Sequence, residues 1–338
     1  VNLLSASPLD VGTDLTIGDD GTGTLSALAS STITIGDDLG VGDEGDGTFT
    51  MTGGTLDVGD EIRVSTDNDG TGDMALDNVV VYCKDFKVAS DSADGDGSGV
   101  GVVVLLNNPG VVLDGGNDDL LIGAYGTGSL TSTGGYIDVN EDVEIGQFGT
   151  GTVTLNSTDI TKSDGSVDVD KVYVGAGENA SGNGELIMNG TSKLRAGNNV
   201  CIGGDKGDNS ESNQGYPAST GILRMNDHAE LYAGDQMRIA CEPLGTGKLY
   251  MNDPNTLVQT INNEDLYIGS WGTAVVEMTG GTIDVDDDMK VGHQDGGNAS
   301  ITMTGGFIRV DDGLTFASSG DATNVVNLTM SSGALILS

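Results

Sequence analysis

Acidic side chains recur at two kinds of position in this chain, and their oxygens could bind a divalent cation. One group stands directly before a short apolar-x-apolar segment: Asp14, Asp38, Glu61, Asp85, Asp119, Asp142, Asp265 and Asp288. The other group lies in turns rich in Asp, Asn and Gly and includes Asp67, Asp69, Asp94 and Asp96. Ca²⁺ takes several oxygens from carboxylates, carbonyls and water on a flexible frame, and such turns can supply them.

We therefore expect a structural Ca²⁺, with candidate ligands Asp14, Asp38, Glu61, Asp85, Asp67, Asp69, Asp94 and Asp96. No run matches an EF-hand loop or the Gly-Gly-x-Gly-x-Asp nonapeptide repeat. The alternative is a solvated acidic face, because Asp and Asn favour turns for conformational reasons alone.

Aromatic residues mark the same corner as the turns rich in Asp, Asn and Gly. Tyr125, Phe148 and Trp271 each directly precede a glycine in a Gly-rich turn, and Tyr216 lies in a loop rich in Asn and Ser. Tyr125 and Phe148 are one repeat apart, so their rings should stack. This arrangement predicts a surface contact or a platform for a sugar, and packing over exposed backbone is the alternative.

Residues suited to catalysis are sparse. His228 and His293 are isolated in the sequence, and no nucleophile elbow, Walker loop or zinc spacing is present. The cysteines Cys83, Cys201 and Cys241 are far apart and odd in number, so we expect ordinary strand residues and no disulfide framework. The sequence predicts a protein that is not an enzyme.

The formal charge is −39, from 52 Asp plus Glu and 13 Lys plus Arg. Nucleic acid is a poor partner for such a chain, because phosphate binding needs a basic face. An anionic membrane surface is a poor partner too, because it would repel a chain of this charge. The sequence contains no apolar run of about 18 residues, so it predicts no membrane span. The charge is typical of an extracellular protein that binds divalent cations, or of a chain adapted to high salt.

These residues are positioned by a repeat of three short strands. In residues 47–64, Phe49 and Met51 alternate with Thr, Leu56 and Val58 flank Asp57, and a third alternating segment follows. The pattern returns at residues 278–291 and again at 303–310. The third segment recurs about twelve times, usually about 23–29 residues apart, as expected of a repeat array. Its apolar pairs are Leu15/Ile17, Leu39/Val41, Ile62/Val64, Phe86/Val88, Leu120/Ile122, Val143/Ile145, Val172/Val174, Val200/Ile202, Met237/Ile239, Leu266/Ile268, Met289/Val291 and Leu314/Phe316.

Three short strands per repeat in a fixed order predict a coil with three sides, stacked into three parallel sheets. The fold class is all-β, a right-handed parallel β-helix of about 12–13 coils, with the hand taken from the general crossover preference. We expect one β-solenoid domain over residues 1–338, with loop insertions near residues 107–118, 176–184 and 204–221. Insertions of this kind become loops on one face.

Residues 47–60, Gly-Thr-Phe-Thr-Met-Thr-Gly-Gly-Thr-Leu-Asp-Val-Gly-Asp, and residues 279–285, Thr-Gly-Gly-Thr-Ile-Asp-Val, carry a resemblance. They resemble the degenerate repeats of bacterial secreted β-helix proteins, including autotransporter passengers and large surface proteins. The resemblance implies export to the cell surface or the medium, and display, adhesion or assembly there. The chain departs from the autotransporter pattern because it has no C-terminal translocator barrel.

Neither end of the sequence shows a helical or charged cap, which a monomeric solenoid needs. The expected interface residues are Val1, Leu3, Leu4, Leu9, Leu335, Ile336 and Leu337. Head-to-tail stacking of copies does not close and would grow a filament or surface layer. Truncation of a longer surface protein would leave the same ends. The alternative functions are an adhesin stalk that binds a surface or glycan through its loops, and a polysaccharide lyase or hydrolase.

Overall fold

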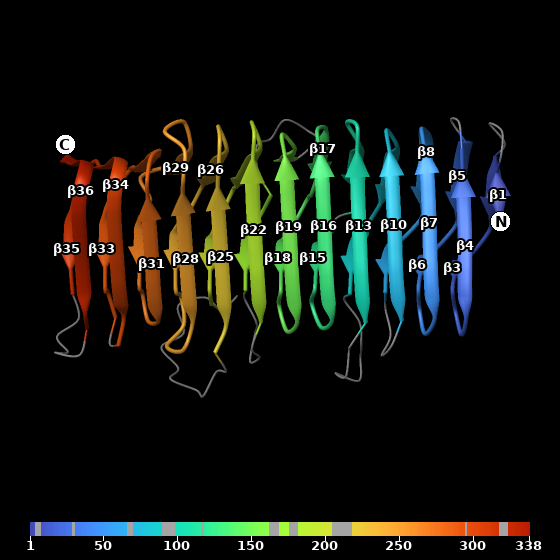
Figure 1. Ribbon diagram of the computed structural model, residues 1–338, viewed down its shortest axis with the longest axis horizontal. Helices are drawn as coiled ribbons and strands as arrows, with labels where there is room; N and C mark the ends of the chain where they lie inside the picture. Colours follow the sequence, from blue (N-terminus) through green and yellow to red (C-terminus); the bar gives the residue numbers. More distant parts are fainter. Residues whose placement is uncertain are drawn as a thin grey trace.

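The computed structural model describes residues 1–3, 8–28, 31–65, 70–89, 99–115, 118–161, 169–175, 182–204, 218–294, 296–317 and 324–338. Within these ranges the chain is all-β, and parallel strands stack into a β-solenoid of about 11 turns (Figure 1). The N-terminus lies at one end of the rod and the C-terminus at the other. Calcium sites predicted at Asp67, Asp69, Asp94 and Asp96 lie outside the described residues.

Each coil contributes one strand to each of three stacks. The first stack comprises β1 (Asn2–Leu3), β4 (Thr22–Ala27), β7 (Asp46–Thr52), β10 (Thr71–Asp77), β13 (Val100–Leu106), β16 (Thr127–Thr133), β19 (Thr150–Asn156), β22 (Asn183–Asn189), β25 (Thr220–Met225), β28 (Thr246–Met251) and β31 (Thr273–Met278). The second comprises β2 (Leu9–Val11), β5 (Ser31–Ile35), β8 (Gly54–Val58), β11 (Val80–Cys83), β14 (Gly110–Leu113), β17 (Tyr136–Asp138), β20 (Asp159–Thr161), β23 (Lys193–Ala196), β26 (Glu230–Ala233), β29 (Leu257–Thr260) and β32 (Thr282–Val285).

The third stack is a separate 12-stranded sheet. Its members are β3 (Leu15–Ile17), β6 (Leu39–Val41), β9 (Glu61–Val64), β12 (Asp85–Val88), β15 (Leu120–Ile122), β18 (Val143–Ile145), β21 (Val172–Val174), β24 (Val200–Ile202), β27 (Met237–Ile239), β30 (Leu266–Ile268), β33 (Met289–Val291) and β35 (Leu314–Phe316). Each strand contains one apolar pair predicted from the sequence, so the third-strand register is confirmed in every coil.

The first two stacks are joined, where the sequence predicted three separate sheets. β34 (Asn298–Val310) and β36 (Val326–Leu337) run through both stacks without a break, and this makes one 24-stranded sheet. Their pairing shifts register between Met303 and Phe307, where the corner is turned. Strand geometry therefore continues around a corner that ends the strand in most other coils.

Side chains alternate between the core and solvent along each strand. In β7 every second residue is buried, and Phe49 pairs in register with Met74, which pairs with Val103. The inward residues of the three stacks form one continuous apolar cluster along the rod. Six methionines of the first stack lie within this cluster and are each at most 1% exposed: Met51, Met188, Met225, Met251, Met278 and Met303. A flexible side chain suits this narrow interior.

Glycine is required where the chain leaves the third stack. Gly146 has φ of +69°, and a Cβ added there would lie 1.9 Å from the carbonyl oxygen of Asn183 in the next coil. Gly123 repeats this geometry one coil earlier, with φ of +68° and the carbonyl oxygen of Thr150 at 2.0 Å. Any side chain would hold adjacent coils apart at this corner.

The predicted insertion at residues 107–118 contains the regular second-stack strand β14. Val111 and Leu113 in that strand are buried, so residues 110–113 keep the repeat, while the connection to β15 is longer than the one between β8 and β9. Residues 176–181 and 205–217 of the other two predicted insertions lie outside the described residues. The right-handed winding and the single-domain assignment stay predictions.

Candidate functional site

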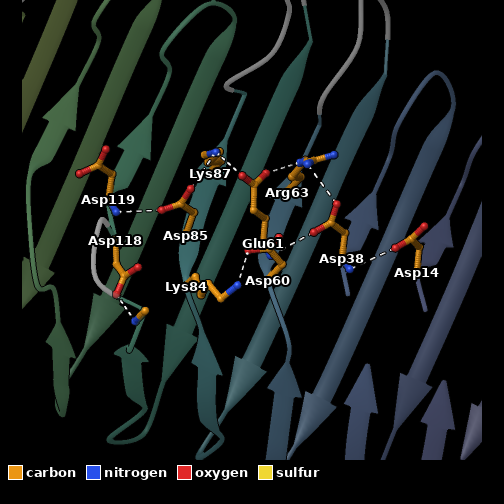
Figure 2. Close-up of polar contacts among 11 residues, drawn as sticks. Asp14, Asp38, Asp60, Glu61, Arg63, Lys84, Asp85, Lys87, Asp118 and Asp119 are labelled. Carbon is orange, nitrogen blue, oxygen red and sulfur yellow. Dashed lines mark hydrogen bonds and ion pairs between the residues drawn. The ribbon is translucent and has the colours of Figure 1, made fainter. Parts of the chain in front are cut away.

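The acidic residues that precede the third strands line one corner of the rod. We call Asp14, Asp38, Glu61, Asp85, Asp119, Asp142, Asp265 and Asp288 the carboxylate ladder. Figure 2 shows that its first five members succeed one another from coil to coil, beside the strands of the third stack. The repeat places them there because each is the residue directly before an inward-facing apolar position.

Ladder carboxylates bind main-chain amides of the next coil. Oδ1 of Asp14 accepts a hydrogen bond from the N–H of Asp38 at 3.3 Å, and Oδ1 of Asp38 accepts one from the N–H of Glu61 at 3.1 Å. The same bond joins Asp85 to Asp119 at 3.0 Å. It also joins Asp119 to Asp142 at 3.0 Å, Asp142 to Lys171 at 3.1 Å, Asp265 to Asp288 at 3.1 Å and Asp288 to Gly313 at 2.9 Å. One role of the ladder is therefore to satisfy N–H groups at the corner.

A second acidic row runs beside the ladder, and the sequence reasoning missed it. It occupies the preceding position, with Asp37, Asp60, Asp118, Asp287 and Asp312 among its members. The signal was present in doublets such as Asp37-Asp38 and Asp287-Asp288, but only the register of the coils shows that both positions stack.

Two cations neutralise the start of the ladder from outward positions on β9 and β12 (Figure 2). Arg63 contacts Asp38 at 3.0 Å and Glu61 at 2.6 Å. Lys87 contacts Glu61 at 2.6 Å and Asp85 at 2.9 Å. Burial alone would raise the pKa of Glu61, but the hydrogen bonds from Lys87 and Arg63 outweigh it and the pKa is lowered.

A lysine also neutralises the carboxylates at the C-terminal end of the ladder. Lys290 on β33 binds Asp265 and lies 3.4 Å from Asp288. The ammonium also lies 5.1 Å from the ring centre of Tyr267, and the ring of His293 packs against that of Tyr267 at 5.1 Å. Burial opposes the charge of Lys290, but the bond to Asp265 prevails and the Lys290 pKa is raised. The His293 pKa is lowered by burial and by the charge of Lys290.

Among the described residues, two groups of three carboxylates are close enough to share a cation. Asp37, Asp38 and Asp60 form one and Asp287, Asp288 and Asp312 the other, with one oxygen of each residue within 4.8 Å of the rest of its group. In the first group Asp38 pairs with Arg63, and Asp60 pairs with Lys84 at 3.1 Å.

These groups differ from the predicted calcium ligands. Asp38 belongs to the first group, whereas Asp14, Glu61 and Asp85 belong to neither, and Lys87 holds Glu61 and Asp85. Calcium binding stays a prediction, and Asp287, Asp288 and Asp312 join the positions at which we would test it.

The predicted stacking of Tyr125 on Phe148 is confirmed. The rings of Tyr125 and Phe148 stack with centroids 4.8 Å apart and planes 12° from parallel. Both side chains and that of Trp271 are half-buried. Each stacked ring uses part of its surface on the other, which reduces the area left for a sugar. Tyr216 lies outside the described residues.

Three outward positions in the middle of the third stack are unexpectedly buried. Glu144, Tyr173 and Cys201 follow one another in register, and each is at most 4% exposed. Tyr173 and Cys201 form a small cluster outside the main core, and Cys241 packs against it. The alternating pattern predicts solvent exposure at these positions, so this cluster could not be found from the pattern.

The predicted interface residues lie at the two ends of the rod. Val1 is 80% exposed, and Leu3 and Leu9 are partly buried in the first coil. Ile336 and Leu337 are 40% and 56% exposed on β36, with Leu335 partly buried beside them. Leu4 lies outside the described residues.

Within the described part of the chain, no helix has the length and apolarity needed to cross a membrane. Comparison with protein-family models, with curated proteins and with solved structures gave no match to the chain.

Proposed function

We propose that the chain is a structural rod of the extracellular space or cell surface that assembles end to end with copies of itself. The observation that supports this proposal is the open edge of β36. Leu328, Met330 and Leu337 of this strand pair in register with Ile301, Met303 and Val310 of β34. The residues of β34 are at most 1% exposed, whereas those of β36 are 38%, 39% and 56% exposed.

An edge of this kind is a template for another parallel coil. Among the described residues β36 pairs with β34 on one side, so its other side presents apolar side chains and main-chain groups that favour strand addition. The first coil of another copy supplies matching strands, β1, β2 and β3, with Leu9, Val11 and Leu15 in the inward positions. Such a contact is heterologous and propagates into a filament. A further coil of a longer polypeptide would fill the same edge.

Charge opposes this contact at low ionic strength. The first coil carries Asp10 and Asp14 and the last carries Asp311 and Asp312, so stacking would bring carboxylates of two copies together. The chain as a whole has a formal charge of −39. We therefore expect assembly to strengthen with added salt, which screens repulsion within about 10 Å at 0.1 M.

Electron microscopy and sedimentation of the purified 338-residue chain test the proposal. We expect fibres with an axial repeat of about 60 Å, because each copy adds the twelve strands of the third stack at about 4.8 Å per strand. The double variant Leu328→Lys/Met330→Lys should abolish the fibres, because charged residues block edge pairing. The control Tyr82→Lys changes a residue that is 43% exposed on an outward face and should leave fibres intact.

Single rods at every salt concentration would contradict self-assembly and favour the adhesin stalk. Turnover of an acidic polysaccharide by the purified chain would favour the enzyme. Binding to a surface glycan stays a prediction, and a glycan array with the monomeric double variant would test it separately from assembly.

A further inference from the structure

The structure brings together two of the three cysteines that lie far apart in the sequence. Cys201 is the central residue of β24, between Val200 and Ile202, which face the core. Its own side chain is on the outward side, yet it is only 4% exposed. Cys241 follows β27, the next strand of the third stack, and packs against the Tyr173–Cys201 cluster.

The main chain holds Cys241 against the preceding coil. Ala240 has φ of +60° and turns the chain after β27. The N–H of Cys241 then donates to the carbonyl oxygen of Gly203 at 3.1 Å. Cys241 is therefore fixed beside the residues that directly follow Cys201. The thiol of Cys241 donates to the carbonyl oxygen of Arg238 at 3.5 Å. The neighbouring thiol of Cys201 and burial raise the pKa of Cys241.

We propose that Cys201 and Cys241 form a disulfide that ties two successive coils together. The two cysteines are not in register, because Cys201 pairs with Arg238 and Cys241 lies three residues further along. The bond therefore rests on the packing of Cys241 against the Tyr173–Cys201 cluster across adjacent coils. It closes a loop that contains the strands β25, β26 and β27. This inference does not depend on end-to-end assembly.

The reaction is a thiol–disulfide exchange with a small disulfide such as oxidised glutathione. One protein thiolate attacks a glutathione sulfur and releases one glutathione thiolate. The second protein thiolate then displaces the other glutathione and forms the S–S bond. The two protein thiols lose two protons and two electrons, and the glutathione disulfide is reduced to two thiols. Because burial disfavours the thiolate, the exchange in the folded chain should be slow near neutral pH and faster at higher pH.

Cys83 provides the internal control. It faces the core from β11, is 3% exposed, and has a pKa raised well above its ordinary value by burial. It belongs to the main apolar cluster, whereas Cys201 and Cys241 belong to the separate small one. We expect Cys83 to remain a thiol when the other two are oxidised.

The test begins with the whole chain unfolded in urea and refolded in a mixture of reduced and oxidised glutathione. Of three cysteines, one titratable thiol should remain after denaturation. Trypsin should then yield residues 196–206 joined to residues 239–248, and only reduction should separate them. The variant Cys83→Ser should fall from two thiols to none, and Cys201→Ala should retain both of its thiols.

A second measurement asks whether the native fold favours the bond. The glutathione ratio that half-reduces the disulfide should be more reducing for the folded chain than for the chain in urea, because the coils hold the thiols together. Three free thiols after refolding would overturn the proposal. So would linkage of either cysteine to Cys83, or the same half-reduction ratio in both states.

Discussion

The carboxylate of Asp119 accepts a hydrogen bond from the main-chain N–H of Asp142, its counterpart in the next coil, at 3.0 Å. This bond recurs between most neighbouring members of the carboxylate ladder. The carboxylates of the ladder carry like charges and would repel one another. Each of these hydrogen bonds offsets part of that repulsion, because a carboxylate accepts from a main-chain amide at the corner. The ladder therefore has a structural role that needs no cation.

Replacing Asp119 tests this role. Asp119→Ala leaves the amide of Asp142 without its acceptor and should reduce the free energy of unfolding by about 1–2 kcal/mol. Asp119→Asn keeps an acceptor oxygen and should lose less than half of that. Urea unfolding measures the free energy, and hydrogen exchange of the peptide around Asp142 locates the effect. Asp20→Ala, at an exposed turn, is the control. Equal losses for the Ala and Asn variants would show that charge, and not the hydrogen bond, matters.

Lys87 should contribute more than an ordinary surface lysine. Its ammonium lies 2.6 Å from Glu61 and 2.9 Å from Asp85, with only 21% of its side chain exposed. Lys87→Met leaves two neighbouring carboxylates uncompensated and should cost about 1–2 kcal/mol in urea unfolding. Added salt should reduce this difference.

Lys84→Met is the matched control for Lys87. Lys84 also binds a carboxylate, Asp60 at 3.1 Å, but its side chain is 49% exposed. Its loss should lower the urea midpoint much less than the loss of Lys87, because exposed ion pairs contribute little to stability. Equal effects of the two substitutions would contradict the assigned importance of burial at Lys87.

The pKa of His293 predicts a specific pH dependence. Burial and the charge of Lys290 lower the pKa from its ordinary value of 6.5, so folding favours the neutral imidazole. Below pH 6.5 the unfolded chain binds more protons than the folded one, and stability falls as the pH falls. Asp265 acts in the opposite direction and Arg238 in the same direction as Lys290.

Comparing His293→Gln with the unmodified chain isolates this contribution. The urea midpoints of the two proteins should converge as the pH is lowered from about 8 to about 5, since only the unmodified chain loses the stability of the neutral ring. Fluorescence of Trp271, the single tryptophan, follows unfolding in the same part of the rod. Midpoints that stay a constant distance apart at every pH would exclude His293 as the source.

Much of the fold was predictable because the repeat leaves few choices. Alternation of apolar and polar residues determines the register of each strand. A shift of one residue would expose the apolar side chains to solvent and bury the polar ones. The twelve apolar pairs of the third segment therefore located every strand of the third stack. The joined sheet was not predictable, because it depends on how the corner at residues 304–306 is turned rather than on hydrophobic pattern.

For the candidate site, the sequence predicted which positions recur at a corner but not which side chains contact one another. The ladder follows from the register, and the stacking of Tyr125 on Phe148 follows from their spacing of one repeat. The Tyr173–Cys201–Cys241 cluster did not follow, since an outward strand position is normally exposed. The three-carboxylate groups were missed for a related reason. They combine two positions of one coil with one position of the next, and only three-dimensional contact selects them.

Gly146 should tolerate no side chain. Gly146→Ala places a Cβ against the carbonyl of Asn183 and forces alanine into a left-handed conformation, so we expect a loss of more than about 2 kcal/mol. Gly21→Ala is the control, because no atom lies within 4 Å of its added Cβ and its φ is ordinary. It should change stability by less than about 0.5 kcal/mol. Similar urea midpoints for the two variants would contradict the tight corner.

Calcium should bind the chain through Asp287, Asp288 and Asp312 in preference to the equivalent group at Asp37, Asp38 and Asp60. Burial and the neighbouring carboxylates Asp265, Asp288 and Asp312 raise the pKa of Asp287, which indicates negative charge that Lys290 does not fully offset. In the other group Arg63 and Lys84 already neutralise two of the three carboxylates. A shallow site of this kind should bind Ca²⁺ with a Kd of about 10⁻⁴–10⁻³ M.

Isothermal titration calorimetry with CaCl₂ in 0.15 M NaCl measures this affinity. The double variant Asp287→Asn/Asp312→Asn should weaken binding at least tenfold, because two anionic ligands are lost, and it should remove any rise in urea midpoint caused by Ca²⁺. Asp37→Asn should change neither measurement. If the double variant binds as tightly as the unmodified chain, the cation belongs elsewhere on the rod, and the acidic corner acts only through its hydrogen bonds and ion pairs.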